Sequence, residues 1–436
     1  MVGGKRMLWN QWYSLRSYVR SSLWIVPFAA VLLYIGAIRV IAALDTGLDW
    51  HDGWFLGEAG PRVVVNAIVN LTLTFLIFTL GSLLVAIQVA GGQLTPRIIA
   101  ATLLSNNALR FIVGLLIFTF LFAMGTSARL ESGPAPLSAI IAGALGYLSL
   151  AAFLFLIDYA ARMLRPVSVL WLVGEKGRAA IREVYPRLEA GSAPPPAHAA
   201  LSSPSQIVTH AGHSAIMLAI NLKAIMALAR EAGAVIELVP MIGDFVGADE
   251  ALFRIYGGTR AIDERQLRGT VAFGPERTID QDSTFSFRIV VDIAIKALSA
   301  AINDPTTAVL AIDQLQRLLR AVGLRQLHND ANHDAGGALR VIARTPNWED
   351  FVHLTFAEIR LYGAGNFQIS RRLRAMIESL IEILPTSRHP ALRHELDLLD
   401  RALVKLHAFP EDLAIARLSD PQGLGGRSAN QQPNGA

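Results

Sequence analysis

Four long apolar runs constrain this chain more than any other feature of its sequence. They lie at roughly 22–44, 63–90, 109–128 and 137–160, and none has an acidic residue deep within it. A helix needs about 20 apolar residues to cross the hydrocarbon core of a bilayer, and each run is long enough. The chain is therefore predicted to be an α-helical integral membrane protein with four transmembrane helices. The first run is too long for a removable signal peptide and should remain as an anchor.

Charged residues in the connections predict how the four spans are oriented. Basic residues precede span 1, lie between spans 2 and 3, and follow span 4: Lys5, Arg6, Arg16, Arg20, Arg97, Arg110, Arg162, Arg165, Lys176 and Arg178. The other two loops are acidic: Asp45, Asp49, Asp52, Glu58 and Glu131. Positive residues favour the cytoplasmic side of a membrane. We therefore expect a multi-pass protein of the bacterial inner membrane with both termini in the cytoplasm.

The composition excludes several classes of protein and site. The chain has no cysteine, which rules out disulfides, thiolate metal sites and cysteine nucleophiles. Its 436 residues are 53% hydrophobic and 17% charged, and most of the charge follows residue 160, which indicates a large soluble part. The net charge of +4 is modest, and the excess arginine lies beside the spans. Nucleic acid is therefore not an expected partner.

Span 2 carries a polar stripe. At about 100° per residue its members fall within an arc of roughly 80°; they are Asn66, Asn70, Thr74, Gly81 and Gln88. One interpretation is packing between helices, including helices of a homo-oligomer, because small and amide side chains are common at such contacts. The other is a polar lining for a conduit. Since no acidic residue lies deep in a span, a passive pore, or no pore at all, is favoured over a proton-coupled transporter.

Other polar and small residues of the spans have local explanations. Arg39 should reach the outer interface, towards Asp45, and Asp158 should pair with Arg162 one turn later. Two small-xxx-small pairs in span 4 predict a packing face: Ala139 with Gly143, and Ala142 with Gly146.

A turn is predicted at the membrane edge after span 2, where the chain reads AGGQLTPR. Gly91 and Gly92 can end the helix, Pro96 can open the next one, and Arg97 would face the headgroups. Gln93, Pro96 and Arg97 are the residues of interest here. A plain turn accounts for them, and a gate or a lipid site is the alternative.

Composition divides the chain into five segments. We expect a four-span domain at 1–165, a linker or long loop at 186–205, a small α/β unit at 206–275, a helical domain at 276–417 and a disordered tail at 418–436. The soluble segments would form a cytoplasmic α+β module.

The small unit contains strand, cap and turn signals. Residues 213–220 and 234–241 are candidate strands, and Asn221 and Gly233 can cap the helix between them. The following Gly-Asp-Phe-Val, with Gly243 and Asp244, resembles the turn of barrel-sandwich (biotinyl or lipoyl-like) domains. No lysine stands at the hairpin tip, so neither biotin nor lipoate is expected, and no cofactor is assigned.

An Asn-Asp-Pro break separates two helical patterns at 285–302 and 305–322. Asp304 can cap the second helix, which Pro305 suits as a first residue, and Asn303 can end the first in a left-handed conformation. The alternative is an anion or partner site, if the preceding charged segment folds back onto this helix start. That polar cluster would comprise Arg277, Asp280, Asp282, Arg288, Asp292, Asn303 and Asp304.

These segments also carry a family resemblance. The motifs ERTIDQD, VDIAIKALSAAINDPTTA, Gly-Asp-Phe-Val and GGQLTPR together resemble the bacterial predicted-membrane-protein family called domain of unknown function 2254, over roughly 10–410. The resemblance implies an inner-membrane location and a cytoplasmic module, and it supplies no activity. Met-Ile stands before Gly243 where a proline is more usual, which would loosen the turn.

No pattern in the chain indicates catalysis. His210 with His213, and the HNDANHD cluster at 328–334, are read as a turn in each case rather than as metal sites. Phosphate-binding, dinucleotide and hydrolase motifs are missing from the sequence. We expect no enzyme, but an oligomeric channel-like or transport-related complex, with its ion or small-molecule ligand unspecified. The alternatives are a membrane-anchored sensor or scaffold without a conduit and, more remotely, an enzyme acting on lipid.

Overall fold

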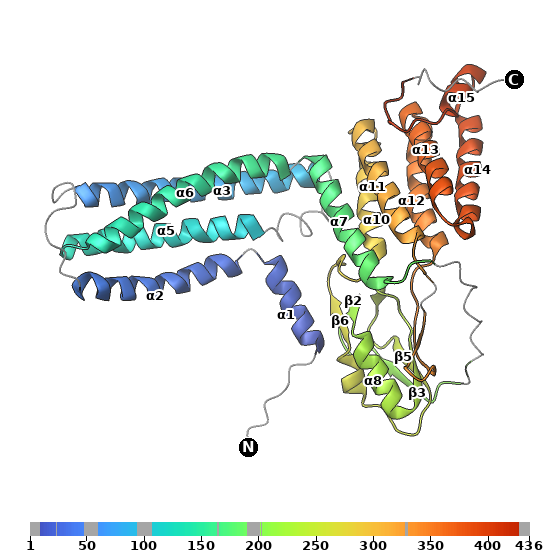
Figure 1. Cartoon of the computed structure of the whole chain (residues 1–436), viewed down its shortest axis with the longest axis horizontal. Helices are drawn as coiled ribbons and strands as arrows, with labels where there is room; N and C mark the ends of the chain where they lie inside the picture. Colours follow the sequence, from blue (N-terminus) through green and yellow to red (C-terminus); the bar gives the residue numbers. More distant parts are fainter. Residues whose placement is uncertain are drawn as a thin grey trace. The chain divides into compact units, whose positions relative to one another are not determined.

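The computed structural model describes most of the chain and divides it into two units. The described residues are 9–22, 24–47, 60–93, 107–163, 165–189, 201, 203–327 and 330–426. Tyr18–Gly92 and Pro96–Val169 form one unit, called the membrane unit below; Met1–Ser17, Gln93–Thr95 and Leu170–Ala436 form the other, called the module. Figure 1 shows the elements along the chain. The linker expected at 186–205 falls mostly outside the described residues.

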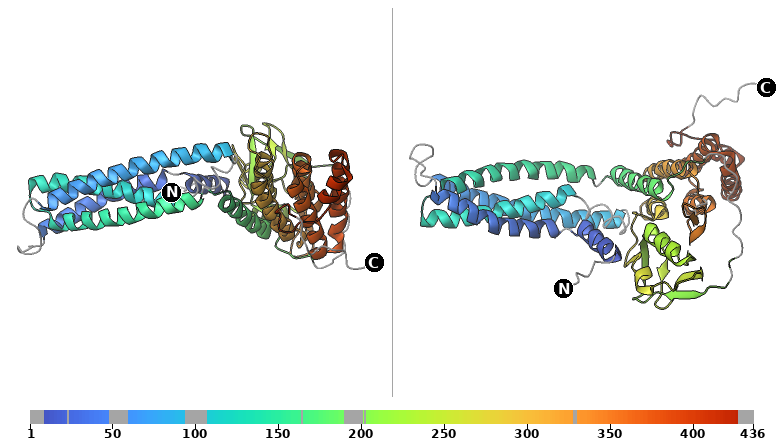
Figure 2. Two further views of the ribbon diagram at one scale, coloured as in Figure 1. Left: turned by 90° about the horizontal axis from the view of Figure 1, so that it is seen from above. Right: turned by 60° about the horizontal axis from the view of Figure 1, so that its bottom comes forward.

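Four long helices build the membrane unit. They are α2 (Ile25–Gly47), α3 (Gly60–Gln93), α5 (Asn107–Ser132) and α6 (Pro136–Met163), and they run side by side in both views of Figure 2. Each is long and apolar enough to cross a membrane, as the sequence predicts. Helix α3 continues through Gly91 and Gly92 instead of ending there. A glycine inside a helix costs only about 1 kcal/mol, so the pair does not force a stop.

Small residues let the helices of the membrane unit approach closely. A Cβ added at Gly114 or Gly146 would lie 2.8 Å from Val26 of α2 or Ile68 of α3, respectively. Ala142 is fully buried, so the Ala142/Gly146 pair forms the packing face predicted for α6. Gly143 has open space above it, so the companion pair does not. Inside the unit, Ser149 Oγ donates to Thr119 Oγ1 at 3.0 Å, linking α6 to α5.

A buried carboxylate ties three helices together at one end of the membrane unit. Asp45 of α2 accepts hydrogen bonds from the Leu137 amide at 2.9 Å and from the Ser138 hydroxyl, both on α6. Arg129 of α5 donates to Asp45 at 3.2 Å. The expected approach of Arg39 to Asp45 is therefore wrong, because Arg129 is the cation that the packing brings to this carboxylate. The predicted Asp158–Arg162 ion pair is confirmed.

Two sheets and one helix enclose the core of the module. The strands are β1 (Gln206–Thr209), β2 (Ala215–Ile220), β3 (Ala234–Leu238), β4 (Phe245–Val246), β5 (Ala251–Gly257), β6 (Val271–Gly274), β7 (Ala331–His333) and β8 (Leu339–Ala343). Their orders are β1-β5-β3-β8-β7 in one sheet and β4-β2-β6 in the other. Helix α8 (Leu222–Ala232) packs on β3 and β8 of the five-stranded sheet, and Ile225, Met217 and Phe253 are fully buried in the shared core.

The sheet crosses the boundary expected at residue 275. Strand β8 pairs in parallel with β3, with Ile236 opposite Val341, and β7 pairs with β8. The segment 276–417 is therefore not purely helical, and the HNDANHD sequence, which was expected to be a turn, contains strand β7. Strand β8 (Leu339–Ala343) is short, and its pairing partner β3 lies about a hundred residues earlier in the chain, so a local sequence pattern does not reveal it.

Helices make up the rest of the module. They are α7 (Pro166–Val184), α9 (Glu264–Arg268), α10 (Ser283–Ala297), α11 (Pro305–Gly323), α12 (Trp348–Gly363), α13 (Phe367–Ile383), η2 (Thr386–Arg388), α14 (His389–Leu406) and α15 (Pro410–Ala416). Helix α10 packs against α11 and α12, and α13 packs against α11 and α14. Predicted caps are confirmed at Asn221, which accepts from Ala224 N at 3.1 Å, and at Gly233, which is left-handed with φ 63°.

The chain after α15 is held against α13 up to residue 426. Asp420, only 5% exposed, accepts from the amides of Gln422, Gly423 and Gly425. Arg371 donates to the Leu418 and Gly425 carbonyls. Residues 418–426, which were expected to belong to a disordered tail, thus make defined contacts with one another and with α13. Asp420 folds this segment onto itself, and polar composition alone does not reveal such a contact.

Candidate functional site

The polar stripe of α3 lies on the outer surface of the membrane unit. All five of its residues are exposed in the single chain: Asn66, Asn70, Thr74, Gly81 and Gln88. The buried residues of the same helix include Val65, Thr72 and Phe75, which lie on roughly the opposite side. Most of the stripe therefore faces away from α2, α5 and α6 of its own chain, and Asn66 is the member with a hydrogen bond to α5.

The stripe differs along its length in how its polar groups are satisfied. Asn66 accepts a hydrogen bond from Ser127 Oγ of α5 at 2.5 Å, and Thr74 donates to the Asn70 carbonyl at 2.8 Å. Within the part of the chain that the structure describes, the side-chain amides of Asn70 and Gln88 have no hydrogen-bond partner. Asn70 is the eleventh residue of the 29-residue candidate span Gly60–Gln88, about 15 Å along the helix from its start. A side-chain amide without a hydrogen-bond partner is unfavourable in hydrocarbon, so a polar group or water next to this face would stabilise it.

Two apolar side chains share the arc of the stripe. Ile77 is 64% exposed and Leu84 is 58% exposed, and at about 100° per residue both point in the direction of Asn66 and Asn70. Gly81 lies between them and has no atom within 4 Å of an added Cβ. The sequence Asn70, Thr74, Ile77, Gly81, Leu84, Gln88 repeats every three or four residues. That spacing is typical of a helix that packs along another helix.

Side chains fill the interior of the membrane unit. Leu116, Phe122, Ala123 and Ala142 are fully buried in two apolar clusters between the helices. Phe75 of α3 stacks on Phe153 of α6 with ring centroids 4.1 Å apart. A polar path through the middle of one copy is therefore not available among the described residues.

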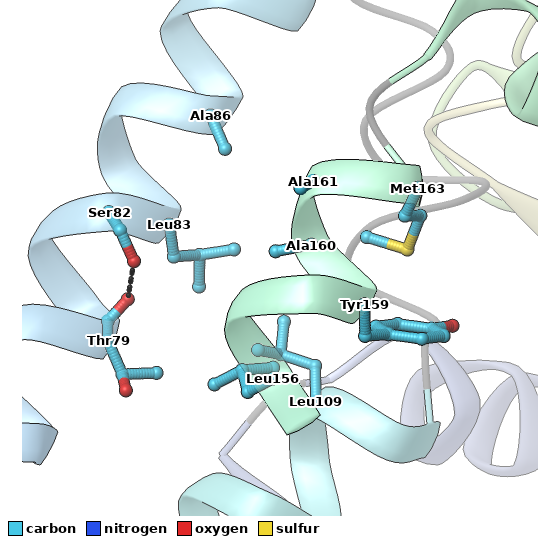
Figure 3. Close-up of a pocket in the computed structure, with 10 residues that line it drawn as sticks. All are labelled: Thr79, Ser82, Leu83, Ala86, Leu109, Leu156, Tyr159, Ala160, Ala161 and Met163. Atoms are coloured by element: carbon cyan, nitrogen blue, oxygen red, sulfur yellow. Dashed lines mark hydrogen bonds between the residues drawn. The ribbon is translucent and has the colours of Figure 1, made fainter. Parts of the chain in front are cut away.

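A small apolar cavity lies between α3 and α6, with Leu109 of α5 beside it (Figure 3). Its volume is about 130 Å³. Thr79, Ser82 and Tyr159 contribute polar groups, and the other walls are aliphatic. The Ser82 hydroxyl donates to the Thr79 carbonyl at 3.0 Å. The lining holds no charged side chain, so the cavity suits a hydrocarbon segment better than an ion.

The charged cluster predicted around the Asn-Asp-Pro break is divided among three places. Arg277, Asp280 and Asp282 precede α10, while Asn303 and Asp304 follow it. Fifteen residues of helix separate the two groups, about 22 Å at 1.5 Å per residue. The fold-back that the alternative anion or partner site would need is not seen, because α10 is a continuous helix between the two groups.

The first group clamps the Gly-Asp-Phe-Val turn. Gly243 has φ 94°, and its carbonyl accepts hydrogen bonds from Arg277 Nε and Nη2. Asp282 caps α10 by accepting from Phe285 N at 3.0 Å, and its second oxygen is buried without a hydrogen-bond partner. Burial raises the pKa of Asp282 above its ordinary value, and Thr284 and Arg277 oppose that shift. An added Cβ at Gly243 would lie 2.5 Å from that oxygen, so only glycine fits.

The second group is an ion-pair network between α10 and α12. Arg288 binds Asp292 one turn away and Glu358 of α12. The bond to Glu358 is the main cause of a raised Arg288 pKa, and it lowers the pKa of Glu358. Glu358 lies 70 residues from Arg288 in the sequence, so sequence reasoning did not include it.

The third group is a helix cap. Asp304 accepts from Thr307 N at 3.1 Å and from the Thr307 hydroxyl, and Asn303 adopts the left-handed conformation with φ 48°. Pro305 is the first residue of α11. The helix-cap interpretation of the Asn-Asp-Pro break is confirmed.

The remaining candidate residues have structural surroundings or lie outside the description. Gln93 is the last residue of α3, whereas Pro96 and Arg97 fall outside the described residues. His210 Nε2 is 2.9 Å from the His213 carbonyl, and its ring lies 4.2 Å from that of Phe273. Among the described residues, no group of three or more His, Cys, Asp or Glu side chains could hold a metal ion.

Four helices long and apolar enough to cross a membrane, together with a sheet-containing C-terminal region, define a mostly helical membrane protein. The family described as "Predicted membrane protein (DUF2254)" matches residues 20–379, and the chain belongs to that family. Uncharacterised proteins of Mycobacterium bovis and Mycobacterium tuberculosis (strain H37Rv) are each 26% identical over 424 residues, 93% of this chain and 81% of the relative. No solved structure matches the chain significantly.

Proposed function

We propose that this protein is a non-enzymatic homo-oligomer of the bacterial inner membrane in which the α3 helices of several copies meet. Its module lies in the cytoplasm, in agreement with the positive charge beside the spans. The joined α3 helices line a polar path for an ion or small solute. The observation that carries the proposal is the exposed side-chain amide of Asn70, which has no hydrogen-bond partner among the described residues and lies four residues from the middle of the candidate span Gly60–Gln88.

The energetic argument concerns where Asn70 can find a partner. Moving an amide from water to hydrocarbon without a hydrogen bond costs roughly 4–8 kcal/mol. A second copy of α3, or water held between copies, removes much of that cost. Because the interior of one copy is filled with apolar side chains, the polar path must run between copies.

A second candidate is an anchored scaffold in which the α3 helices close tightly. Ile77 and Leu84 favour it, since both lie in the arc of the stripe and would exclude water from part of it. In a conduit, the same two residues form an apolar constriction that gates by dewetting. The two candidates share the oligomer and differ in whether water reaches Asn70.

Thiol labelling distinguishes the two, because the native chain has no cysteine. Single cysteines replace Asn70, Thr74 and Gln88, with Leu154 of α6, 59% exposed, as the lipid-facing control. A conduit predicts reaction with a membrane-impermeant thiol reagent at the three stripe positions and not at Leu154. Protection of all four positions contradicts a conduit and leaves the scaffold.

Flux provides the second measurement. Asn70→Leu should reduce ion flux through reconstituted protein while the oligomer remains assembled. If the amide only holds helices together, its loss weakens assembly instead, by about 0.6 kcal/mol for an average interhelical hydrogen bond.

A further inference from the structure

Helix α1 (Trp9–Ser21) presents an uncovered apolar face immediately before the first span. Trp12, Leu15 and Val19 are 45%, 52% and 41% exposed. Their spacing of three and four residues puts them on one side of the helix. Arg16 lies beside this face, with its guanidinium carbon 5.1 Å from the centre of the Trp12 ring.

Two residues of α1 outside this apolar face form hydrogen bonds with the module. Tyr13 Oη donates to Asp280 at 3.5 Å, and the Asn10 amide donates to the Gly269 carbonyl at 3.3 Å. Partial burial, and then the Asp280 charge, raises the pKa of Tyr13 to about 12. Asp280 is two residues from Asp282, the cap of α10. The helix is therefore attached to the module through Tyr13 and Asn10, while its apolar face stays open.

Chain connectivity fixes what can cover that face. Only three residues separate the end of α1 at Ser21 from the start of α2 at Ile25. Extended chain spans at most about 3.6 Å per residue, so α1 ends within roughly 15 Å of a membrane-spanning helix. The headgroup region extends about 5–8 Å beyond the hydrocarbon core on each side. Tryptophan beside arginine is typical of helices that lie in this region.

We propose that α1 is an interfacial helix bound to the lipid surface. Trp12, Leu15 and Val19 enter the boundary between headgroups and acyl chains, and Arg16 binds the phosphates of anionic phospholipid. Through the Tyr13–Asp280 hydrogen bond, the helix holds the Arg277–Asp282 segment of the module at that surface. The bilayer thereby stabilises the connection that starts α10.

Depth measurements by spin labelling test the position of the helix. Single nitroxides replace Leu15 and Val19, and the exposed polar position Ser14, about 100° round the helix from Leu15, is the matched control. In nanodiscs, Leu15 and Val19 should be relaxed by oxygen and protected from a water-soluble nickel chelate, whereas Ser14 should show the reverse. Equal access of the chelate to all three positions would overturn the proposal. Protection of Leu15 and Val19 from both reagents would overturn it too, because it indicates cover by protein.

Lipid composition tests the role of Arg16. Adding phosphatidylglycerol to phosphatidylcholine nanodiscs should deepen the label at Leu15, and Arg16→Gln should remove that difference. Equal depth in the two lipids with Arg16 present contradicts binding of anionic headgroups.

Hydrogen exchange tests the attachment to the module. Tyr13→Phe should raise amide exchange of residues 276–284 by roughly twofold to fivefold, the effect of a modest hydrogen bond, and leave the depth of Leu15 unchanged. Tyr256→Phe is the control, because Tyr256 donates to Glu237 elsewhere in the module. Unchanged exchange in the Tyr13 variant, or an equal rise in both variants, would refute the attachment.

Discussion

Removing the Asp304 carboxylate should destabilise α11 by an amount that the local hydrogen bonds define. Asp304→Ala deletes the acceptor for Thr307 N at 3.1 Å and for the Thr307 hydroxyl, and Thr307 is only 8% exposed. Loss of a helix cap costs about 0.5–2 kcal/mol. An additional buried donor without a partner costs about 1–3 kcal/mol, less whatever water recovers at this half-buried site. We expect a total loss of about 1–2.5 kcal/mol.

A buried thiol in α11 reports the change. Ala311 is fully buried, and Ala311→Cys gives the full-length protein a single cysteine. In mild urea, its labelling rate follows the population of opened α11. Asp304→Ala should raise that rate roughly fivefold to sixtyfold, at about tenfold for every 1.4 kcal/mol.

The serine variant distinguishes a cap from a charge-dependent site. Serine also accepts a hydrogen bond from the first turn of a helix, so Asp304→Ser should restore most of the lost stability. If Asp304→Ser labels as fast as Asp304→Ala, the capping explanation is wrong and the charge itself matters.

Three further changes test other parts of the structure. Gly177→Ala should destabilise the module by about 1–3 kcal/mol in the same assay, because its Cβ would contact Ser286 of α10 and Leu318 of α11; Gly365→Ala, which has open space, should not. Asp282 has a raised folded-state pKa, so its contribution to stability is greatest below the unfolded pKa of about 3.9 and falls as pH rises towards the folded value. Asp282→Asn should therefore flatten the pH dependence of unfolding in that range; an unaltered profile would contradict the assignment. Asp420→Ala should speed amide exchange of residues 418–426 at least as much as it speeds exchange of α13. If residues 418–426 are equally protected in the variant and in the unchanged protein, Asp420 does not fix this segment.

Local signals in the sequence predict most of the helices and caps. The four apolar runs correspond to α2, α3, α5 and α6, and the cap residues Asn221 and Asp304 bond the amides expected of them. These features depend on a few neighbouring residues, so they can be recognised without a tertiary structure. The family resemblance is likewise confirmed by the match over residues 20–379.

The features that sequence reasoning missed depend on distant contacts. Strand β8 is recognisable only beside β3, and Glu358 joins Arg288 only because α10 packs on α12. Asp45 pairs with Arg129, 84 residues away, rather than with Arg39. Which way the α3 stripe faces also depends on distant contacts. Periodicity predicts that its residues share one face of the helix, but only the packing of α2, α5 and α6 shows that this face is the outer one.

Cross-linking at Gly81 tests most directly whether the stripe is the contact between copies. Gly81 and Gly36 of α2 are both exposed glycines of membrane-spanning helices, with no atom within 4 Å of an added Cβ, so they form a matched pair. Disulfides form when Cα atoms come within about 4.4–6.8 Å, a distance that packed helices reach at small residues. Oxidation in membranes should yield a covalent dimer of Gly81→Cys and leave Gly36→Cys monomeric. Monomeric protein from both variants, or equal cross-linking of both, would contradict assembly through α3.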